Sequence, residues 1–290
     1  MESSTQDAYH VTLLYPPNYA WAKTFDEIIE TVVYGLQGLG IQPTFAENHI
    51  VRGSTNIIFG AHLVDVTPIL ELPETTIIVY NFEQLEKTLD NWNPAFRTAL
   101  QRAVVWDYDA INVDYRFRIF GKQSTLVPVG FVPELRRIRP GNEDIDVILF
   151  GVPSSRRIAV IEALRQQGVR AVVLERVWGL ARDLWIRRAK VILNIHQFSA
   201  TDSLEQVRLS YCLANSRLVV SETPSQPLEW SAYQEGILWS SYNGLVDRCL
   251  EALADETLRQ HTAARGYALF SRMLEETFLS PALATVTSTR

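Results

Sequence analysis

The segment from residue 145 to residue 222 constrains the fold of this chain most, because short apolar runs and helix-length runs alternate along it. The apolar runs include IDVILF at 145–150, AVVL at 171–174 and RLVVSE at 217–222. Such β-branched runs, separated by amphipathic segments, are typical of a parallel sheet covered by helices on both faces. Sheets of this kind bind ligands beyond the carboxyl ends of their strands. The polar residues just after each run are therefore the candidates for binding.

The first part of the chain shows a similar alternation. Strands are expected at 11–15, 56–60, 75–80 and 103–107. A helix is expected at 22–40, from the spacing of its apolar residues, and a further helical stretch at 82–102. Asp109 is placed to cap a further helix, and Gly121 is suited to end it in a left-handed turn. These features predict a second Rossmann-like sheet.

Residues 124–144 contain prolines, glycines and mixed charge, which is typical of a domain linker. We expect an N-terminal domain at 1–127, a linker at 128–144 and a C-terminal domain at 145–290. A chain of 290 residues is long enough to form two cores of ordinary size. The predicted fold is α/β, with two Rossmann-like domains facing one another across a cleft.

The composition narrows the class of protein. A formal net charge of −6 argues against sequence-independent binding of nucleic acid, which needs a broad basic surface. Cys212 and Cys249 provide no disulfide framework, so we expect both to be reduced core residues. The sequence has no basic stretch followed by an apolar one at its start, and no apolar run of membrane-spanning length. We expect a cytoplasmic protein without a transmembrane segment.

The loop FGVPSSRR at 150–157 has the character of a phosphate site. Its candidate residues are Gly151, Ser154, Ser155, Arg156 and Arg157. The glycine allows close approach of a ligand to the backbone, and either serine can cap the helix that follows. The amide groups and positive end of that helix suit a diphosphate, to which either arginine can add a charge-assisted contact. The alternative is a capped helix with two arginines on its solvated face.

The run LNIH at 193–196 ends a strand, so Asn194 and His196 should emerge at the ligand-binding edge. A histidine there can donate a hydrogen bond to a leaving phosphate, in either protonation state. It can also hold the following loop. The next helix is expected to start at Thr201 or Asp202 and to end at Asn215.

Several of these stretches occur in an order that resembles a known family. They are VWDY at 105–108, VPVGF at 127–131, LFGVPSSRR at 149–157, LNIH at 193–196 and VVSE at 219–222. Together with a glutamate-containing helix, this order resembles the GT-B glycosyltransferases, nearest to the CgeB-like or glycosyltransferase family 4-like branch. The resemblance implies transfer of a sugar from a nucleotide donor, held by the C-terminal domain, to an acceptor held by the N-terminal domain. It also implies that the final helices brace the first domain.

The resemblance suggests roles for further residues. Glu205 is the candidate to bind ribose hydroxyls, and Arg208 lies on the same helical face, where the two can instead form an ion pair. Glu222 can bind hydroxyls of the donor sugar or cap the next element. Trp178, which lies between Arg176 and Arg182, can stack on a base or belong to the core.

The paired glutamates of retaining members would fall near Asp202 and Ser210, and neither of these is a glutamate. Retention or inversion at the anomeric carbon therefore stays open. The expected co-substrate is a nucleotide sugar, with no permanently bound cofactor and no metal ion, although DYD at 107–109 is an acidic pair. The acceptor is an unidentified glycan, protein or small molecule.

An inverting transfer would need a base from the first domain to take the proton of the acceptor. The candidates follow its strands, and they are His62, Glu83 and Asp107, with Asp109 close to the last. The histidine has the most useful ordinary pKa, while the carboxyl groups need burial or a like charge. Each can also be structural. Two other functions stay open: a sugar-nucleotide epimerase or hydrolase on the same scaffold, and a catalytically inactive binding subunit.

Overall fold

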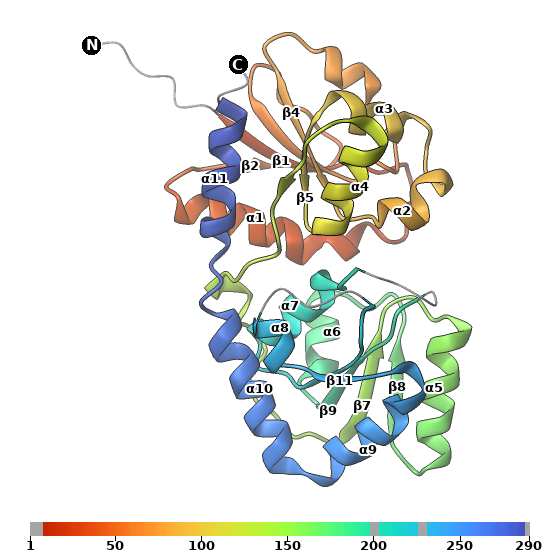
Figure 1. Cartoon of the computed structure of the whole chain (residues 1–290). Helices are drawn as coiled ribbons and strands as arrows, with labels where there is room; N and C mark the ends of the chain where they lie inside the picture. Colours follow the sequence, from red (N-terminus) through yellow and green to blue (C-terminus); the bar gives the residue numbers. More distant parts are fainter. Residues whose placement is uncertain (1–7, 198–202, 226–230, 288–290) are drawn as a thin grey trace. The chain divides into compact units, whose positions relative to one another are not determined.

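The computed structural model describes residues 8–197, 203–225 and 231–287, and the chain forms two compact units (Figure 1). The first unit comprises the chain up to Val129 together with the segment from Glu275 onward. The second unit is Gly130–Leu274. Each unit contains a sheet with parallel strand pairing and helices packed on it, so the chain has the expected α/β class.

The sheet of the first unit has the strand order β2-β1-β3-β4-β5-β6. Its strands are β1 (Tyr9–Leu13), β2 (Thr44–Phe45), β3 (Thr55–Phe59), β4 (Thr76–Asn81), β5 (Val104–Asp107) and β6 (Thr125–Leu126). Neighbouring strands pair in parallel, and β1 and β3 are buried along their whole length. The strands expected at 11–15, 56–60, 75–80 and 103–107 are confirmed to within two residues at each end.

The helices of the first unit connect these strands or pack on them. They are α1 (Asp26–Gly38), α2 (Leu85–Thr88), α3 (Ala95–Arg102), α4 (Ala110–Phe120) and α11 (Glu275–Thr287), with short 3₁₀ turns η1 (Ala22–Phe25), η2 (Thr67–Glu71) and η3 (Leu89–Asn91). The carboxylate of Asp109 accepts a hydrogen bond from the amide of Ile111 (2.8 Å), which confirms it as the cap of α4. Gly121 ends α4 with φ +63°, as expected.

The continuous helix expected over 82–102 is wrong. The segment divides into α2, η3 and α3, and the break falls at Asn93 and Pro94. The side chain of Asn93 accepts a hydrogen bond from the amide of Ala95 (2.9 Å), which starts a new helix there. Proline has no amide hydrogen and disfavours helical geometry in the residue before it, so the earlier helix cannot continue through this point.

Helix α11 packs against α1, and Gly35 allows their close approach. A Cβ atom at Gly35 would lie 2.5 Å from Cγ of Glu275 and 2.8 Å from a methyl carbon of Leu279. Leu283 and Val286 are buried as well. The sequence SPALATVTSTR at 280–290 is typical of a frayed terminus, but this prediction is wrong as far as Thr287, because the apolar residues of this segment form the end of α11.

The sheet of the second unit has the strand order β11-β10-β9-β7-β8. Its strands are β7 (Ile145–Phe150), β8 (Ala171–Leu174), β9 (Ala189–Asn194), β10 (Val219–Glu222) and β11 (Leu238–Ser240). Val147, Val191, Leu193 and Val220 are fully buried in one hydrophobic cluster between this sheet and its helices. Parallel pairing places the carboxyl ends of these strands along one edge.

The helices of the second unit lie on either side of its sheet, with α5 and α10 flanking it in Figure 1. They are α5 (Ser155–Gln166), α6 (Gly179–Ile186), α7 (Gln206–Ala214), α8 (Ser231–Glu235), α9 (Leu245–Ala254) and α10 (Glu256–Phe270), with 3₁₀ turns η4 (Pro133–Leu135) and η5 (Tyr242–Gly244). Helix α7 starts at Gln206, later than expected, and Thr201 and Asp202 lie outside the described residues. Asn215 is its C-cap, as expected, and Cys212 and Cys249 are confirmed as free and buried.

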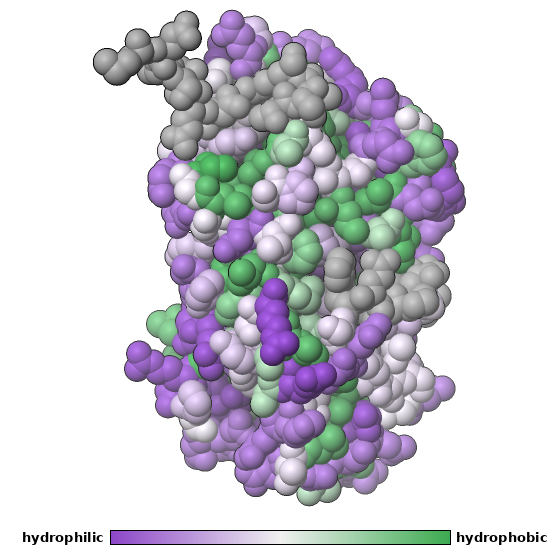
Figure 2. Space-filling model, turned by 60° about the vertical axis from the view of Figure 1, so that its left-hand side comes forward, coloured by the Kyte–Doolittle hydropathy of each residue, from purple (hydrophilic) through white to green (hydrophobic). Residues whose placement is uncertain are grey.

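Within the described residues, the helices are too short or too polar to cross a membrane. Figure 2 shows one face of the molecule, on which hydrophilic residues predominate and hydrophobic residues form separate groups.

Candidate functional site

The loop between β7 and α5 begins with Gly151, whose backbone has φ +127°. L-amino acids with a side chain rarely adopt this conformation. A Cβ atom added here would also lie 2.8 Å from Nη2 of Arg208. The turn therefore favours glycine, and a side chain at this position would displace the guanidinium of Arg208.

Helix α5 begins at the same edge of the sheet. Oγ of Ser154 accepts a hydrogen bond from the amide of Arg157 (3.4 Å), so Ser154, rather than Ser155, is the cap. The first intrahelical bond runs from the amide of Ile158 to the carbonyl of Ser154 (2.9 Å). The amides of Ser155 and Arg156 precede it and point toward the N-terminal end of α5, where the helix dipole is positive.

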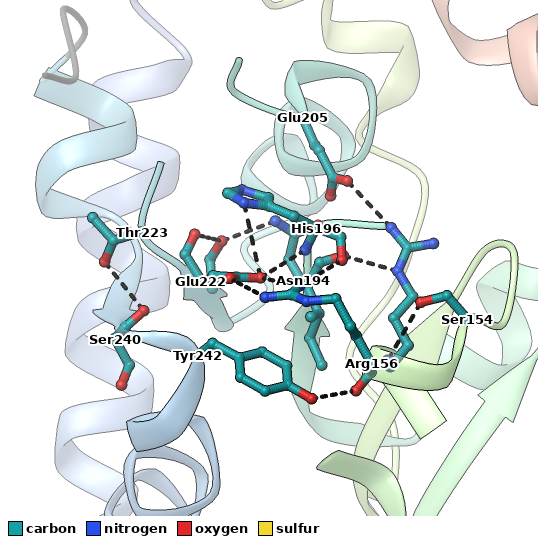
Figure 3. A network of polar contacts seen from close by, with 12 residues as sticks. Ser154, Arg156, Asn194, His196, Glu205, Glu222, Thr223, Ser240 and Tyr242 are labelled. Atoms are coloured by element: carbon teal, nitrogen blue, oxygen red, sulfur yellow. Dashed lines mark hydrogen bonds and ion pairs between the residues drawn. The ribbon is translucent and has the colours of Figure 1, made fainter. Parts of the chain in front are cut away.

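The side chain of Arg156 reaches across the edge to the end of β10 (Figure 3). Its guanidinium donates to both carboxylate oxygens of Glu222, at 2.7 and 3.1 Å, and to the carbonyl of His196 at 3.0 Å. It also lies 4.1 Å from the ring centroid of Tyr242, whose hydroxyl donates to the carbonyl of Arg156 (2.9 Å). The bond to Glu222 raises the pKa of Arg156 above its ordinary value. Arg156 is therefore charged and held in one orientation.

Arg157 is almost fully buried and ties the loop to β9. Its guanidinium donates to the carbonyls of Ile195 (2.8 Å) and Val152 (2.7 Å) and to Oε1 of Glu205 (3.2 Å). Burial, with a smaller contribution from nearby Arg208, lowers the pKa of Arg157 to about 10, so it stays charged at neutral pH. Three acceptors on two segments make this side chain a clamp that fixes the shape of the loop.

Glu205 lies immediately before α7 and bridges two arginines. Its second oxygen, Oε2, lies 2.5 Å from Nη1 of Arg208, so the ion pair expected as the structural alternative is present. Arg208 also donates to Oδ1 of Asn194, whose amide nitrogen donates to Oγ of Ser221 (2.8 Å). The guanidinium of Arg208 lies 5.5 Å from the ring centroid of Phe150. These contacts join the ends of β7, β9 and β10.

His196 is 3% exposed and contacts Glu222 twice. Its amide donates to Oε2 of Glu222 (3.0 Å), and its ring nitrogen Nδ1 lies 3.8 Å from the same oxygen. Burial lowers the pKa of His196 below its ordinary value, so the ring is neutral at pH 7. A neutral imidazole can donate from one nitrogen and accept at the other.

One network thus joins seven of the residues expected from the sequence: Arg156, Arg157, Asn194, His196, Glu205, Arg208 and Glu222. Three guanidinium groups, of Arg156, Arg157 and Arg208, face the two carboxylates of Glu205 and Glu222, which leaves an excess of one positive charge. This excess and the N-terminus of α5 both favour an anion at the edge of the sheet.

Two aromatic residues, Trp178 and Tyr242, lie at the same edge of the sheet. Trp178 is half-buried at the start of α6, the helix that follows β8. Tyr242, which packs on Arg156, was not expected from the sequence. The signal that it offered was its place just after the short strand LWS, at the same carboxyl edge.

The first unit has its own pair of ionisable residues at the carboxyl edge of its sheet. Nε2 of His62 lies 3.3 Å from Oε1 of Glu83, and these residues follow β3 and β4. The His62 ring packs against Trp92, at a centroid distance of 4.5 Å, and against Phe96 and Phe25. Burial lowers the pKa of His62 to about 3 and raises that of Glu83 to about 8. Near pH 7 the pair therefore consists of a neutral imidazole and a carboxyl group that is mostly protonated.

Asp107 is fully buried and its carboxylate accepts three hydrogen bonds. They come from the side-chain amides of Asn81 (2.8 Å) and Asn112 (3.0 Å) and from the backbone amide of Asp109 (3.0 Å). Both asparagines also donate to the carbonyl of Glu83. Burial raises the pKa of Asp107 to about 8, against the opposing effect of its donors. The geometry makes Asp107 a residue that positions the loop bearing Glu83.

The acidic sequence DYD does not gather metal ligands. Asp107 is engaged with the two asparagines, and Asp109 caps α4. In the part of the chain that the structure describes, no group of three or more histidine, cysteine, aspartate or glutamate side chains is arranged to hold a metal ion.

Neither a protein-family model nor a curated protein sequence matches this chain. Solved structures do. Anabaena HepE, in complex with UDP and glucose, is similar with a TM-score of 0.59 and 10% identity, covering 97% of this chain and 100% of HepE. WaaG, a glycosyltransferase involved in lipopolysaccharide biosynthesis, gives a TM-score of 0.53 and 12% identity, covering 93% of this chain and 98% of WaaG.

A third similar structure is a variant of Staphylococcus aureus TarM in complex with fondaparinux, α-GlcNAc-glycerol and UDP. Its TM-score is 0.59 and its identity is 11%, and the match covers 87% of this chain and 57% of TarM. This chain therefore spans little more than half the length of TarM. At such identities the likeness shows the fold alone: two parallel-sheet α/β domains, like those of GT-B glycosyltransferases.

Proposed function

We propose that this protein is a glycosyltransferase of GT-B architecture that binds a nucleotide-sugar donor in the unit Gly130–Leu274. The observation that carries this proposal is the network at the carboxyl edge of the second sheet, where the N-terminus of α5 and three arginines converge. Ligands of open α/β sheets bind at this edge. The UDP present in the complexes of HepE and TarM adds support for a nucleotide of this type.

The diphosphate is assigned to the loop at Gly151 and the start of α5. The amides of Ser155 and Arg156 donate to its oxygens, and the guanidinium of Arg156 adds charge. Arg157 does not contact the diphosphate and instead fixes the conformation of the loop through its hydrogen bonds to the carbonyls of Ile195 and Val152. His196, as a neutral imidazole beside Arg156, can donate a further hydrogen bond to the leaving phosphate.

The rest of the donor is assigned to the neighbouring elements. Glu205 accepts hydrogen bonds from the ribose hydroxyls while Arg157 and Arg208 hold its carboxylate in place. Glu222 binds hydroxyls of the sugar, positioned by Arg156. Trp178 forms one wall for the base.

The acceptor is assigned to the first unit, with Glu83 as the base and His62 as its hydrogen-bonding neighbour. A pKa of about 8 places Glu83 close to the pH at which a general base works best. Asn81 and Asn112 fix the backbone of Glu83 by donating hydrogen bonds to its carbonyl, and Asp107 in turn holds the side chain of Asn81.

In an inverting transfer, the acceptor hydroxyl oxygen forms a bond to the anomeric carbon as the bond from that carbon to the diphosphate oxygen breaks. The acceptor proton passes to the ionised form of Glu83, which is the minor form near pH 7 and becomes the major form above pH 8. The diphosphate leaves with both electrons of the broken bond, and the α5 amides and Arg156 stabilise its increased charge. We propose that these groups do so without a metal ion, so EDTA should leave the rate of transfer unchanged.

A thermal-shift screen tests the donor assignment. UDP, GDP, CDP, ADP, dTDP and their sugar conjugates are added in turn, because a ligand that binds only the folded state raises the melting temperature. A clear preference for one diphosphate supports the proposal and selects the sugar series for transfer assays. No shift with any of them contradicts it. Turnover of the donor without an acceptor would instead indicate an epimerase or hydrolase, and binding without turnover would indicate an inactive subunit.

A further inference from the structure

A second concave site lies in the unit Gly130–Leu274, at the opposite end of the sheet from the donor network. It is a cavity of about 480 Å³ between the segment after η4 and the turn from α7 to β10. Four of its lining residues are arginines: Arg136, Arg137, Arg139 and Arg217. Arg217 lies just before β10, whereas Glu222 of the donor network ends the same strand. The cavity is therefore separate from the donor network.

The segment that carries three of these arginines is held rigidly by one side chain. Oδ1 of Asn215 accepts hydrogen bonds from the amides of Arg137 and Ile138, both at 2.8 Å. Nδ2 of Asn215 donates to the carbonyl of Leu135 (2.9 Å). The arginines thus project from a fixed backbone.

Two of the arginine side chains are also oriented by aromatic residues. The guanidinium of Arg136 lies 4.1 Å from the ring centroid of Tyr267 and donates to its hydroxyl (2.8 Å). Nε of Arg137 donates to the hydroxyl of Tyr211 (3.0 Å) and lies 3.5 Å from a carboxylate oxygen of Asp183. Side chains that are already ordered lose little entropy when they bind a ligand.

The charges around the cavity are unbalanced. Arg217 pairs with Glu143 (2.9 Å) and Arg137 with Asp183, whereas Arg136 and Arg139 make no ion pair with any carboxylate of the described residues. Guanidinium groups gathered at one cavity repel one another, and an anion among them relieves that repulsion.

Arg217 gives a second, independent indication. Its side chain is nine-tenths buried, and within the described part of the chain its Nε has no hydrogen-bond partner. A buried donor without an acceptor is unfavourable, and native proteins contain few of them. Arg217 also lines a neighbouring cavity of about 350 Å³, whose wall combines the carboxylates of Glu143 and Glu256 with the cations of Lys190, Arg217 and Arg259, whereas the described residues that line the arginine-lined cavity include no carboxylate. The arginine-lined cavity is therefore the better anion site.

We propose that the arginine-lined cavity binds a small phosphorylated compound, in addition to the nucleotide sugar assigned to the donor network. The planar guanidinium fork matches two phosphate oxygens at once. Ile138 and Pro140 provide an apolar wall for the organic part of the ligand. A volume of about 480 Å³ is ordinary for a small-molecule site. The concave shape and the net charge of −6 favour a compact anion over an extended polyanion.

Calorimetric titration of inorganic pyrophosphate into the full chain tests this site. The variants are Arg139→Gln and Arg136→Gln, and Arg265→Gln is the matched control because Arg265 is an exposed arginine of α10 that pairs with Glu235. We expect either cavity variant to weaken one pyrophosphate site by at least about tenfold. The control should change it by less than about twofold.

UDP titrations separate this result from the proposed donor site. If the donor assignment holds, pyrophosphate binds at two sites in the wild type, and Arg139→Gln removes one while leaving UDP affinity unchanged. If the donor assignment fails, a single pyrophosphate site remains and Arg139→Gln removes it. Identical isotherms for the wild type and both cavity variants overturn the inference. The inference is also overturned if the wild type does not bind pyrophosphate. This holds as well if the wild type binds vesicles of phosphatidylglycerol but not pyrophosphate.

Discussion

The guanidinium of Arg156 and the carboxylate of Glu222 form a two-pronged ion pair, with N···O distances of 2.7 and 3.1 Å. The pair joins the first turn of α5 to the end of β10, which are 66 residues apart in the sequence. Glu222 also accepts from the amide of His196, at the end of β9. One carboxylate therefore sets the spacing of the elements that form the proposed donor site.

Glu222→Gln should lower the free energy of unfolding by about 1–3 kcal/mol, because charge-assisted hydrogen bonds in a largely buried site are replaced by weaker ones. Urea denaturation at pH 7 measures this. The control is Glu251→Gln, which breaks an exposed pair with Arg248 and should cost less than about 1 kcal/mol. Equal effects of the two substitutions would show that the Arg156–Glu222 pair has no special structural weight.

Glu205→Gln distinguishes ribose binding from a role in positioning arginines. A carboxylate that binds ribose loses affinity for UDP when it is neutralised, but loses little for 2′,3′-dideoxy-UDP, which has no ribose hydroxyls. We expect UDP to bind at least about fivefold more weakly to the variant, with a much smaller change for the dideoxy analogue. Calorimetry with both ligands measures the difference. Equal losses would mean that Glu205 acts through Arg157 and Arg208.

Glu83→Gln should change the pH dependence of stability. The pKa of Glu83 is raised to about 8 in the folded protein, from an ordinary value of 4.5. Below pH 4.5 Glu83 is protonated in both the folded and the unfolded protein, and its contribution to the free energy of unfolding is then at its full value. This contribution is lost as the pH rises from 4.5 to 8, because the unfolded protein releases its proton first. Glutamine does not titrate, so the variant lacks this loss. Between pH 5 and pH 8 its free energy of unfolding should rise, relative to that of the wild type, by at least about 1 kcal/mol.

Urea denaturation at the two pH values measures that gain. The matched control is Glu86→Gln on α2, an exposed residue that is 3.7 Å from Arg118 and should show no comparable gain. A wild type and a Glu83→Gln variant with parallel pH profiles would show that Glu83 is ionised throughout this range. It would then also be a weak base at neutral pH.

The strands and the cap residues could be predicted from the sequence because their causes are local. Runs such as IDVILF at 145–150 are buried on both faces, so they carry a strong pattern. Asp109 and Ser154 act on amides only two or three residues away. The break between η3 and α3 also has a local cause, because Pro94 itself is a signal that a helix ends before it.

The partners within the site could not be predicted, because they depend on how distant strands align. His62 and Glu83 were separate candidates in the sequence, and only the order of β3 and β4 brings them to 3.3 Å. The sequence predicts that Arg156 faces solvent or phosphate. Its stacking on Tyr242 has no local signal, because Tyr242 follows a strand of only three residues. Asp107 carried no signal that two asparagines enclose it.

The most direct test of the donor assignment is the affinity of UDP, or of whichever diphosphate the screen selects, for the wild type, Gly151→Ala and Gly168→Ala. Both glycines have positive φ, at +127° and +78°, so both substitutions strain the backbone. Only at Gly151 does the new methyl group meet Arg208, at 2.8 Å, whereas nothing lies within 4 Å at Gly168. We predict a loss of at least about tenfold for Gly151→Ala and little change for Gly168→Ala, with both variants folded. Equal affinities of all three proteins would contradict the assignment of the diphosphate to this loop.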